Sequence, residues 1–575
     1  MRKTLSIILS VIMVLSLCII GISAADGEKI SNPTEFLAMK ADGTYYLDAD
    51  LVITASYGAG ETPVPFTGTL DGNGHTVTVT APVFASLGKA TIKNLTIEGE
   101  ITATDNAGAL ATLVSAEIID DFTAYAVIEN CVNKAKVTMT VPETATSSSY
   151  WGAGGFIGKS VDHCGAMFIG CVNEGDVVVK CPQETDALKI RYSGGGFAGV
   201  CDTFLARDCV NKGNISFEGD WALCLEQDAF GGFVGRAAAV ASFNYINIEY
   251  CVNEGNVKGG RYAGGFCGYA GLGSNTTQYD MGNTPYRFIG NINKGEIEGK
   301  RWAGGIAGYL YTTANDNSET FDIQFNLVEG KIISARWCSH FVGYSNSICN
   351  IFKFNVGTAE LAKGTGEDTQ DWMFCFLGCS SANYRNDAEF HDNYVVDDAG
   401  LYKYLTYAES ESNAANRIEF SWGVENNYVT VVNATQLATG EIAYKINKAA
   451  NANGFNQTLG TDQTPTPSKD SSYVVQDGNS YKNSATAEFD PIEYYDVTTE
   501  EVTTKGETTK KETTAAVTTA AAPTETTAAA PTETTAAPTD VTTAAPAKKG
   551  CKSVIGIGVA IVAVLGAAYV SKKKF

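Results

Sequence analysis

The sequence predicts an all-β protein that folds as a parallel β-helix, a solenoid in which each coil of the chain stacks on the previous one. Three observations support this prediction. A phrase of about 20 residues recurs with a period of about 40. Each copy consists of three short apolar runs separated by turn residues, which predicts three strands in each coil. No run is long and periodic enough for an amphipathic helix.

The repeated phrase is clearest in the stretch that begins at Ile248 and reads IEYCVNEGNVKGGRYAGGFCGY. Its first run ends in Cys-Val-Asn, and the Asn-Glu-Gly or Asn-Lys-Gly that follows favours a turn. Its third run is Gly-Gly-Phe-x-Gly, in which the glycines suit a crowded corner. The equivalents of the first cysteine are Cys131, Cys171, Cys209, Cys251, Asn291 and Asn326.

Stacked coils place equivalent residues above one another at about 4.8 Å, so each repeated position is expected to form a column. The asparagine column is predicted to be a ladder of side-chain hydrogen bonds, and it contains Asn133, Asn173, Asn211, Asn253 and Asn293. The cysteines are expected inside as small apolar residues in the reduced state. An aromatic column contains Tyr262, Trp302, Trp337 and Trp372. Strand alternation predicts that these rings point inward with the Phe column and that the adjacent arginines point outward.

These residues and the Gly-Gly-Phe-x-Gly motif resemble the right-handed β-helix surface proteins of Gram-positive bacteria, including those with a glycine-rich GLUG-type motif. The resemblance covers roughly Thr34 to Asn483. It implies a right-handed coil and an adhesin-type protein at the cell surface. Because proteins of this family differ in function, the resemblance does not by itself select an activity.

The chain is predicted to be secreted and held at the cell membrane. Residues 1–25 combine a basic start, an apolar run and small residues at the end, as in a signal peptide. Residues 496–552 are rich in Thr, Ala and Pro and are expected to form a disordered, extended stalk. Residues 553–571 are apolar and predict a transmembrane helix, followed by a cytoplasmic basic tail at residues 572–575. The rest of the chain would then lie at the extracellular surface.

Between these segments, a β-helix of residues 67–400 is expected between two caps with short helices. The N-terminal cap, residues 26–66, contains a helix start with Ser31 or Asn32 as N-cap. The C-terminal cap, residues 401–495, contains apolar residues at helical spacing. These residues are Leu437, Ile442, Ala443 and Ile446.

Long insertions between the second and third runs of the early coils form the first candidate binding surface. They are expected to lie side by side and bring acidic residues next to one tryptophan. The candidate ligand-binding residues are Glu184, Asp186, Glu218, Asp220, Trp221, Glu226 and Asp228. This chemistry suits a glycan or a cation, and a solvated acidic fringe is the alternative interpretation. The alternative ligand-binding set is Arg261, Arg301 and Arg336, because guanidinium groups can bind hydroxyls or carboxylates.

The net charge and the motifs that the sequence lacks argue against several classes of function. A formal net charge of −23 argues against nucleic-acid partners. The sequence contains no phosphate-binding loop, zinc-ligand spacing or nucleophile elbow. No cofactor is expected, with calcium as the alternative in the acidic insertions and at a tight turn closed by His75.

We therefore predict a monomeric cell-surface protein that binds an extracellular glycan or another cell-surface ligand and acts as an adhesin. The membrane is a further expected partner, through the C-terminal helix. A polysaccharide lyase or hydrolase is the first alternative, because carboxylates that converge only in the folded chain are invisible in the sequence. A structural wall-coat protein is the second.

Overall fold

The structure is a computed structural model. It describes residues 27–115, 125–141, 150–161, 164–181, 191–219, 228–238, 245–271, 286–311, 321–346, 351–364, 373–378, 390–397, 400, 402, 404–407, 418–467 and 473–492. The predicted signal peptide, stalk, transmembrane helix and basic tail lie outside these described residues. Within them, no helix combines the length and apolar character needed to cross a membrane.

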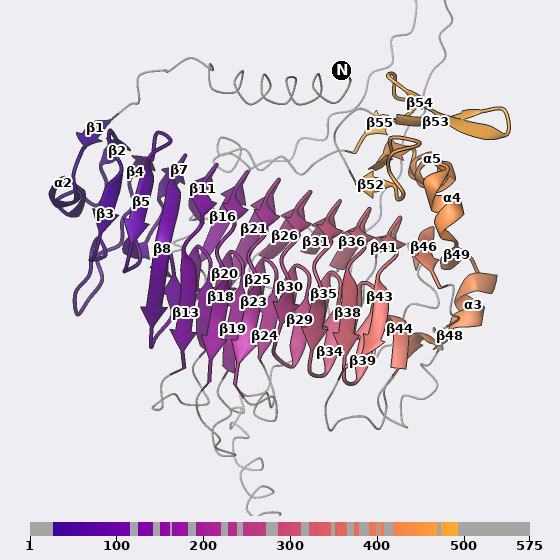
Figure 1. Cartoon of the computed structure of the whole chain (residues 1–575), viewed down its shortest axis with the longest axis horizontal. Coiled ribbons are helices and arrows are strands. Elements are labelled where there is room, and N and C mark those ends of the chain that lie inside the picture. Colours follow the sequence, from indigo (N-terminus) through magenta and orange to yellow (C-terminus); the bar gives the residue numbers. More distant parts are fainter. Residues whose placement is uncertain are drawn as a thin grey trace, which may run out of the picture. The chain divides into compact units, whose positions relative to one another are not determined.

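The described chain winds into a parallel β-solenoid whose coils lie side by side (Figure 1). Each central coil contains five short strands. In one coil they are β26 (Tyr245–Glu249), β27 (Val252–Asn253), β28 (Val257–Lys258), β29 (Tyr262–Gly264) and β30 (Cys267–Gly271). Each strand pairs in parallel with its equivalent in the previous coil, and this pairing produces five sheets, which we number in the order of the chain.

The prediction of a parallel β-solenoid is confirmed, but the prediction of three strands per coil is wrong. The first run bends just before its cysteine, where Tyr250 has a φ of 53° and separates β26 from β27. The third run is split at Gly265 and Phe266. A Cβ at Gly265 would lie 2.6 Å from the Asn293 side chain and 2.1 Å from a backbone oxygen, so only glycine fits this corner. Both bends fall inside apolar runs, so hydrophobic patterning does not reveal them.

The bounds of the strands are as follows. The first sheet contains β1 (Glu28–Ile30), β2 (Thr44–Leu47), β4 (Thr69–Asp71), β7 (Thr91–Lys93), β11 (Tyr125–Glu129), β16 (Gly165–Ile169), β21 (Thr203–Arg207), β26, β31 (Tyr286–Ile289), β36 (Phe321–Gln324), β41 (Ile351–Lys353) and β45 (Phe390–His391). The second contains β3 (Leu51–Ile53), β5 (Thr76–Val79), β8 (Thr96–Ala103), β12 (Val132–Asn133), β17 (Val172–Asn173), β22 (Val210–Asn211), β27, β32 (Ile292–Asn293), β37 (Leu327–Val328), β42 (Val356–Gly357), β46 (Asn393–Val396) and β49 (Val429–Val432). The third contains the second half of β8, β13 (Lys136–Thr140), β18 (Val177–Lys180), β23 (Ile215–Glu218), β28, β33 (Ile297–Gly299), β38 (Lys331–Ser334) and β43 (Glu360–Lys363).

The fourth sheet contains β9 (Ala107–Gly108), β14 (Tyr150–Gly154), β19 (Arg191–Gly195), β24 (Ala229–Gly231), β29, β34 (Trp302–Gly304), β39 (Trp337–Ser339), β44 (Met373–Gly378), β47 (Tyr404–Tyr407) and the antiparallel β48 (Ile418–Glu419). The fifth contains β6 (Phe84–Leu87), β10 (Ala111–Val114), β15 (Ile157–Ser160), β20 (Ala198–Val200), β25 (Val234–Ala238), β30, β35 (Ala307–Tyr311) and β40 (Val342–Asn346).

The predicted asparagine ladder is confirmed. From Asn133 to Asn293, each side-chain Nδ2 donates to the Oδ1 of the next asparagine in the column at 2.8 Å. Each Nδ2 also donates to the carbonyl oxygen two residues further along its own chain. All five side chains are fully buried, so these bonds replace water that the amides have lost.

Two apolar cores run along the solenoid. The main core contains the Phe column and the cysteine column. The second lies between the fourth and fifth sheets and contains Tyr262, Trp302 and Trp337, with Tyr269 packed against Tyr262 at a centroid distance of 5.5 Å. The predicted orientation of the aromatic column is therefore wrong, although the rings are buried. Alternation does not carry through the bend between β29 and β30, so Ala263 faces the main core and Tyr262 faces away from it.

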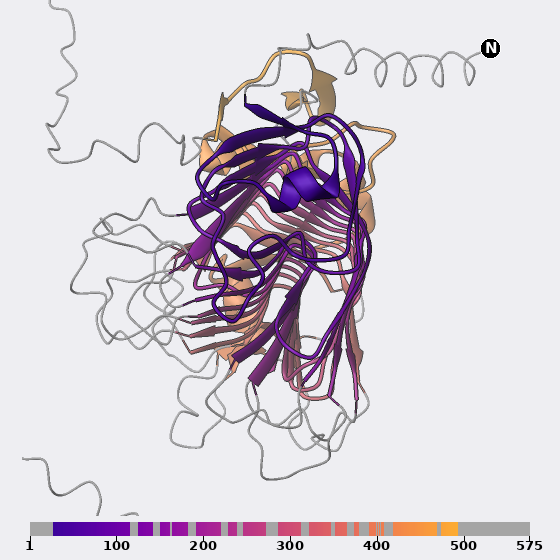
Figure 2. The same ribbon diagram turned by 90° about the vertical axis from the view of Figure 1, so that its left-hand side faces the viewer.

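Helix α2 (Pro33–Leu37) confirms the predicted N-terminal helix. Asn32 is its N-cap, and the Asn32 side chain accepts a hydrogen bond from the Glu35 backbone N–H at 3.0 Å. Phe36 is fully buried and joins the main core. The helix crosses the end of the stack, as the end-on view of Figure 2 shows, and so covers the first coil.

In the C-terminal cap, the residues that were predicted to be helical do lie in helices. Its elements are α3 (Phe420–Glu425), α4 (Ala434–Ala438), α5 (Glu441–Ala450), β50 (Ala452–Asn453), β51 (Phe455–Asn456), β52 (Thr466–Pro467), β53 (Tyr473–Asp477), β54 (Ser480–Ser484) and β55 (Asp490–Pro491). Leu437 and Ile446 are buried in a separate apolar cluster with Phe325 and Phe354 of the solenoid. The cap therefore packs on the flank of the last coils.

Candidate functional site

The outer face of the first sheet carries apolar side chains at its centre. In β16, Phe168 belongs to the main core, so strand alternation places Met167 on the outer face. Parallel pairing puts Met167 beside Leu205 of β21, and Leu205 beside Asn247 of β26. Met167 and Leu205 form a small cluster apart from the main core. Asn247 then begins a polar part of the same row.

A second outward row lies two residues further along each strand. It places Ile169 beside Arg207, and Arg207 beside Glu249. In the first row, Asn247 is followed on the next coils by Arg287 and then Asp322. We call this surface the outer strip, and its residues are Met167, Ile169, Leu205, Arg207, Asn247, Glu249, Arg287 and Asp322.

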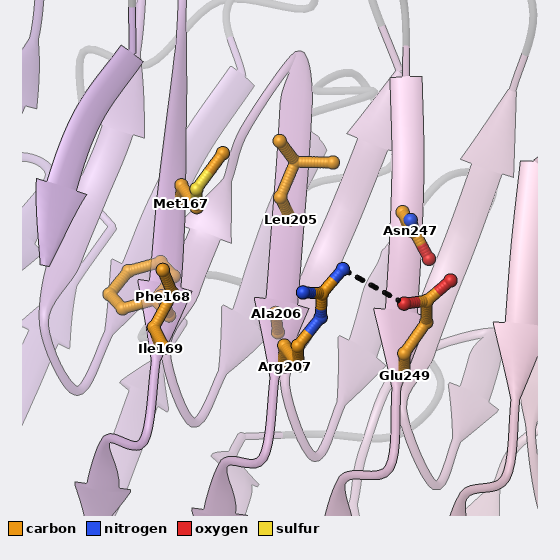
Figure 3. A pocket seen from close by; sticks show the side chains of 8 residues that line it. All are labelled: Met167, Phe168, Ile169, Leu205, Ala206, Arg207, Asn247 and Glu249. Atoms are coloured by element: carbon orange, nitrogen blue, oxygen red, sulfur yellow. Dashed lines mark hydrogen bonds and ion pairs between the residues drawn. The ribbon is translucent and has the colours of Figure 1, made fainter. Parts of the chain in front are cut away.

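A shallow hollow lies on the outer strip (Figure 3). Figure 3 shows Met167 and Leu205 beside each other, with the Arg207 guanidinium extended toward Glu249 on the next coil. The hollow has a volume of about 30 Å³, which is enough for a water-sized group. A site that encloses a small molecule is typically about 300–1,000 Å³, so the outer strip is a docking surface and not an enclosing pocket.

An ion-pair network organises the polar part of the strip. Glu249 is paired with the guanidinium groups of Arg207 at 3.3 Å and Arg287 at 3.1 Å. Arg287 also reaches Asp322 at 3.8 Å, and Gln324 donates to Asp322 at 2.5 Å. Burial raises the pKa of Asp322 to about 6, although the Gln324 hydrogen bond and the Arg287 charge oppose the shift. These contacts hold the charged side chains in fixed positions.

Asn247 contributes an unused hydrogen-bond acceptor. Its side chain is 4% exposed, and its Oδ1 has no hydrogen-bond partner among the residues that the structure describes. Asn247 lines the hollow next to Leu205. A buried acceptor without a donor costs about 1–3 kcal/mol, so a water or a ligand group that donates a hydrogen bond would be favoured there.

The strip combines three kinds of contact within a few ångströms. Met167 and Leu205, which are 6% and 5% exposed, offer apolar groups at the hollow, Asn247 offers an acceptor, and Arg207 offers a guanidinium whose side chain is 24% exposed. Both carboxylates are engaged by arginines. Across the described parts of the chain, no three His, Cys, Asp or Glu side chains come together in a way that could hold a metal ion.

Most of the predicted acidic fringe lies outside the described residues: Glu184, Asp186, Asp220, Trp221 and Glu226. Glu218 is exposed and forms an ion pair with Lys180 at 3.0 Å. Asp228, in contrast, is 1% exposed and does not lie at the solvent.

Asp228 lies at the start of the fourth sheet, where its carbonyl oxygen accepts from the Tyr262 backbone N–H at 3.1 Å. Burial raises the pKa of its carboxyl group to about 7, against the opposing effect of a hydrogen bond from Tyr192 and the charge of Arg236. Asp228 therefore lies in the interior, whereas Glu218 lies at the surface, and the two do not form one acidic site.

The alternative set, Arg261, Arg301 and Arg336, lies on successive coils at the entrance to the fourth sheet. The Arg261 and Arg301 guanidinium carbons lie 4.9 and 4.6 Å from the Trp302 ring centroid, and that of Arg336 lies 5.5 Å from the Trp337 ring. These contacts are cation–π interactions with the second core. Arg336 is 7% exposed, so this row is more enclosed than its sequence suggests.

Sequence reasoning missed the outer strip because it followed only positions that repeat. The relevant position does not repeat: it reads Val127, Met167, Leu205, Asn247, Arg287 and Asp322 in successive coils. An outward position that is apolar in three neighbouring coils was the available signal, since an exposed strand face is normally polar.

Comparison with known proteins adds little to this description. No protein family matches the sequence, and no curated protein matches it. A similar solved structure is that of a Bacteroides ovatus protein provisionally identified as an immunoglobulin A1 protease. The two share 13% sequence identity over 77% of this chain and 93% of the other, with a TM-score of 0.28. A similarity at this level transfers no activity.

Proposed function

We propose that this chain is a cell-surface adhesin that binds an extended extracellular glycan along the outer strip. The expected signal peptide, stalk and transmembrane helix support display outside the cell. The resemblance to Gram-positive β-helix surface proteins with GLUG-type motifs supports the same location. In this proposal the ectodomain is a solenoid held away from the membrane, and the outer face of its first sheet meets the ligand.

The observation that carries the proposal is the Asn247 acceptor beside the apolar pair Met167 and Leu205. A sugar ring offers hydroxyl donors at its edge and C–H groups on its face, so one ring could satisfy Asn247 while it covers the apolar pair. The partly exposed Arg207 guanidinium could bind a second hydroxyl or a carboxylate. Because coils repeat at about 4.8 Å, a linear glycan that runs across the strands would meet the apolar pair first and then Asn247 on the next coil.

A shallow surface fits binding better than catalysis. Glycoside hydrolysis requires one carboxyl group that donates a proton and another that attacks or activates water. Glu249 lines the small hollow, but Glu249 and Asp322 are both paired with Arg287 and do not flank a substrate-sized cavity in the described part of the structure. Release of product from a bound glycan would nevertheless support the enzyme alternative.

The test is a glycan array with the secreted ectodomain, followed by affinity measurements on variants. Asn247→Leu removes the acceptor with little change of volume and should weaken binding about tenfold, which is one hydrogen bond's worth of free energy. Asn256→Ala is the matched control, because Asn256 is an exposed asparagine on the second-to-third-sheet turn. It should bind like the native protein.

Other outcomes would overturn the assignment. If Trp221→Ala abolishes binding while Asn247→Leu does not, the acidic fringe is the site. If only Arg301→Ala abolishes binding, the arginine row is the site. Cleavage of the glycan would indicate an enzyme, and the absence of any glycan ligand would favour a structural coat.

A further inference from the structure

A second hollow lies where the C-terminal cap meets the flank of the last coils. It has a volume of about 340 Å³. This volume is at the lower end of the range for pockets that hold one small ring-sized group, about 300–1,000 Å³. Its lining residues are Gln324, Phe325, Lys353, Phe354, Ala450, Asn451, Ala452, Asp490, Pro491 and Ile492. We call it the cap hollow.

Two phenylalanines in an unfavourable backbone conformation form its apolar side. Phe325 and Phe354 have φ values of 55° and 61°, and their rings stack at 5.0 Å. Most other coils place Asn130, Gly170, Asp208 or Gly290 at this corner, which are residue types that adopt positive φ more readily, and one coil places Tyr250 there. A bulky residue there costs about 1–2 kcal/mol, and only at the hollow do two successive coils carry one among the described corners.

The contacts that the structure shows for Phe325 and Phe354 explain only part of their placement at this corner. Phe325 contacts Phe455 of the cap at a centroid distance of 6.4 Å, and Phe354 meets His391 edge-on at 5.9 Å. The Phe325–Phe455 contact fastens the cap to the flank, whereas His391 belongs to β45 of the solenoid. The hollow beside them remains, and its rim carries the Lys353 amine, which lies 5.5 Å from the Phe354 ring centroid, and the Asp490 carboxylate.

The chain itself supplies an occupant within reach. Ile492 lines the cap hollow, and the next residues are Glu493, Tyr494 and Tyr495. Two or three extended residues span about 7–10 Å, so either tyrosine can reach the hollow from Ile492. Downstream of Tyr495 the sequence has no aromatic residue until Tyr569. This tyrosine pair thus lies between the hollow and a stalk that contains no aromatic residue.

We propose that the cap hollow binds Tyr494 or Tyr495 and so fastens the root of the stalk to the solenoid. A phenol ring suits the apolar side, and its hydroxyl can accept a hydrogen bond from Lys353 or donate one to Asp490. This inference is independent of which ligand the outer strip binds.

The fastening has a mechanical consequence. Without it, the last pairing before the stalk is the parallel contact of β55 with β50, which involves only Asp490 and Pro491 opposite Ala452 and Asn453. A force applied through the stalk would pull directly on this short pairing. A docked tyrosine would instead transmit the force to the corners of two coils.

Thiol cross-linking tests the proposal on the whole secreted chain. Lys353→Cys is combined with Asp496→Cys, which keeps both tyrosines, and disulfide formation under mild oxidation is followed by peptide mass spectrometry. Nine native cysteines are buried and should not compete. Serine replaces five further cysteines in every variant, because the described structure does not establish their burial: Cys224, Cys349, Cys375, Cys379 and Cys551. The cross-link should form rapidly and within one molecule.

Two backgrounds make the test specific. Tyr494→Ser with Tyr495→Ser should slow the cross-link about tenfold, because docking raises the effective concentration of the two thiols. Tyr494→Phe with Tyr495→Phe keeps the rings and should stay close to the native rate. Circular dichroism checks that the solenoid is intact in each variant.

Three results would overturn the proposal. Equal rates in the Ser and native backgrounds would show that the tyrosines do not dock. Cross-links between molecules would indicate that a second copy fills the hollow. A small molecule found in the hollow by native mass spectrometry would make it a ligand site.

Discussion

Removing one rung of the asparagine ladder tests what holds the coils in register. Asn211 lies in the middle of the ladder and makes three hydrogen bonds. Its Nδ2 donates to Gly213 O at 3.0 Å and to Asn253 Oδ1 at 2.8 Å, and its Oδ1 accepts from Asn173 Nδ2 at 2.8 Å. Asn211→Ala removes all three bonds from a fully buried site.

The expected loss follows from these bonds. Each is worth about 1 kcal/mol net, and the Asn253 Oδ1 that loses its donor adds a penalty of about 1–3 kcal/mol. Asn173 Nδ2 keeps its hydrogen bond to Gly175 O, while its other N–H loses the Asn211 acceptor. We expect Asn211→Ala to lower the free energy of unfolding by about 4–6 kcal/mol in total.

The first comparison is with Asn293, which lies at the end of the ladder and makes fewer hydrogen bonds than Asn211. Asn293 accepts from Asn253 and donates to Gly295 O at 3.1 Å. Asn293→Ala removes two bonds and orphans no side-chain acceptor in the described ladder, so about 1–2 kcal/mol should be lost. Lys212→Ala is the exposed control: Lys212 pairs with Glu174 at 3.1 Å on the surface, and its loss should cost less than about 1 kcal/mol.

The assay is urea unfolding of the secreted chain, followed by circular dichroism and by hydrogen exchange of the coils around each mutation. Exchange is needed because stacked repeats can open locally without unfolding the whole solenoid. The reasoning would be refuted if Asn293→Ala proved as costly as Asn211→Ala, or if Lys212→Ala matched either.

Three further predictions follow from burial. Phe266→Ala should cost about 3–5 kcal/mol because Phe266 is fully buried in the main core, whereas the exposed Glu218→Ala should stay within about 0.5 kcal/mol, as urea unfolding would show. Thiol titration should find the column cysteines reactive only after denaturation, and a sharp loss of melting temperature on adding reductant would contradict their assignment as free thiols. Burial lowers the pKa of His340 to about 4, so the unfolded chain, with an ordinary value near 6.5, binds more protons between these values and stability should fall by about 3 kcal/mol as pH drops from 6.5 to 4. Comparison with His340→Gln isolates this effect from Asp228 and Asp322, whose raised pKa values act in the opposite direction, and identical pH profiles of the two proteins would contradict it.

The sequence was sufficient for features that depend on exact repetition. The Asn133 to Asn293 column repeats without exception, so stacking alone predicts its hydrogen bonds. The Asn32 cap could likewise be predicted, because capping is local. The bend at Gly265 could not, because it splits an apolar run whose pattern looks continuous, and the face of Tyr262 was assigned wrongly for the same reason.

The candidate site could not be predicted from the repeat. Its residues, such as Leu205 and Asn247, are the ones that differ from coil to coil on an outward position. A repeat reports what every coil needs in order to stack, and a binding surface consists of what one coil has and its neighbour lacks. Asp228 shows the reverse error, since it was grouped with exposed acids by sequence proximity and lies buried at the start of a strand.

Cysteines in the early coils and asparagines in the later coils make equivalent hydrogen bonds at the cysteine column. Cys171 Sγ accepts from the Cys131 backbone N–H at 3.5 Å and donates to Ile128 O at 3.3 Å. Three positions further along the column, Asn291 makes the same two contacts: its Oδ1 accepts from the Cys251 N–H at 3.0 Å and its Nδ2 donates to Ile248 O at 2.8 Å. A thiol is the weaker hydrogen-bonding group, but it can both donate and accept, as an amide can. The buried cysteines therefore act as rungs of a ladder that asparagine continues, and this accounts for a column of thiols in a protein expected outside the cell without requiring disulfides.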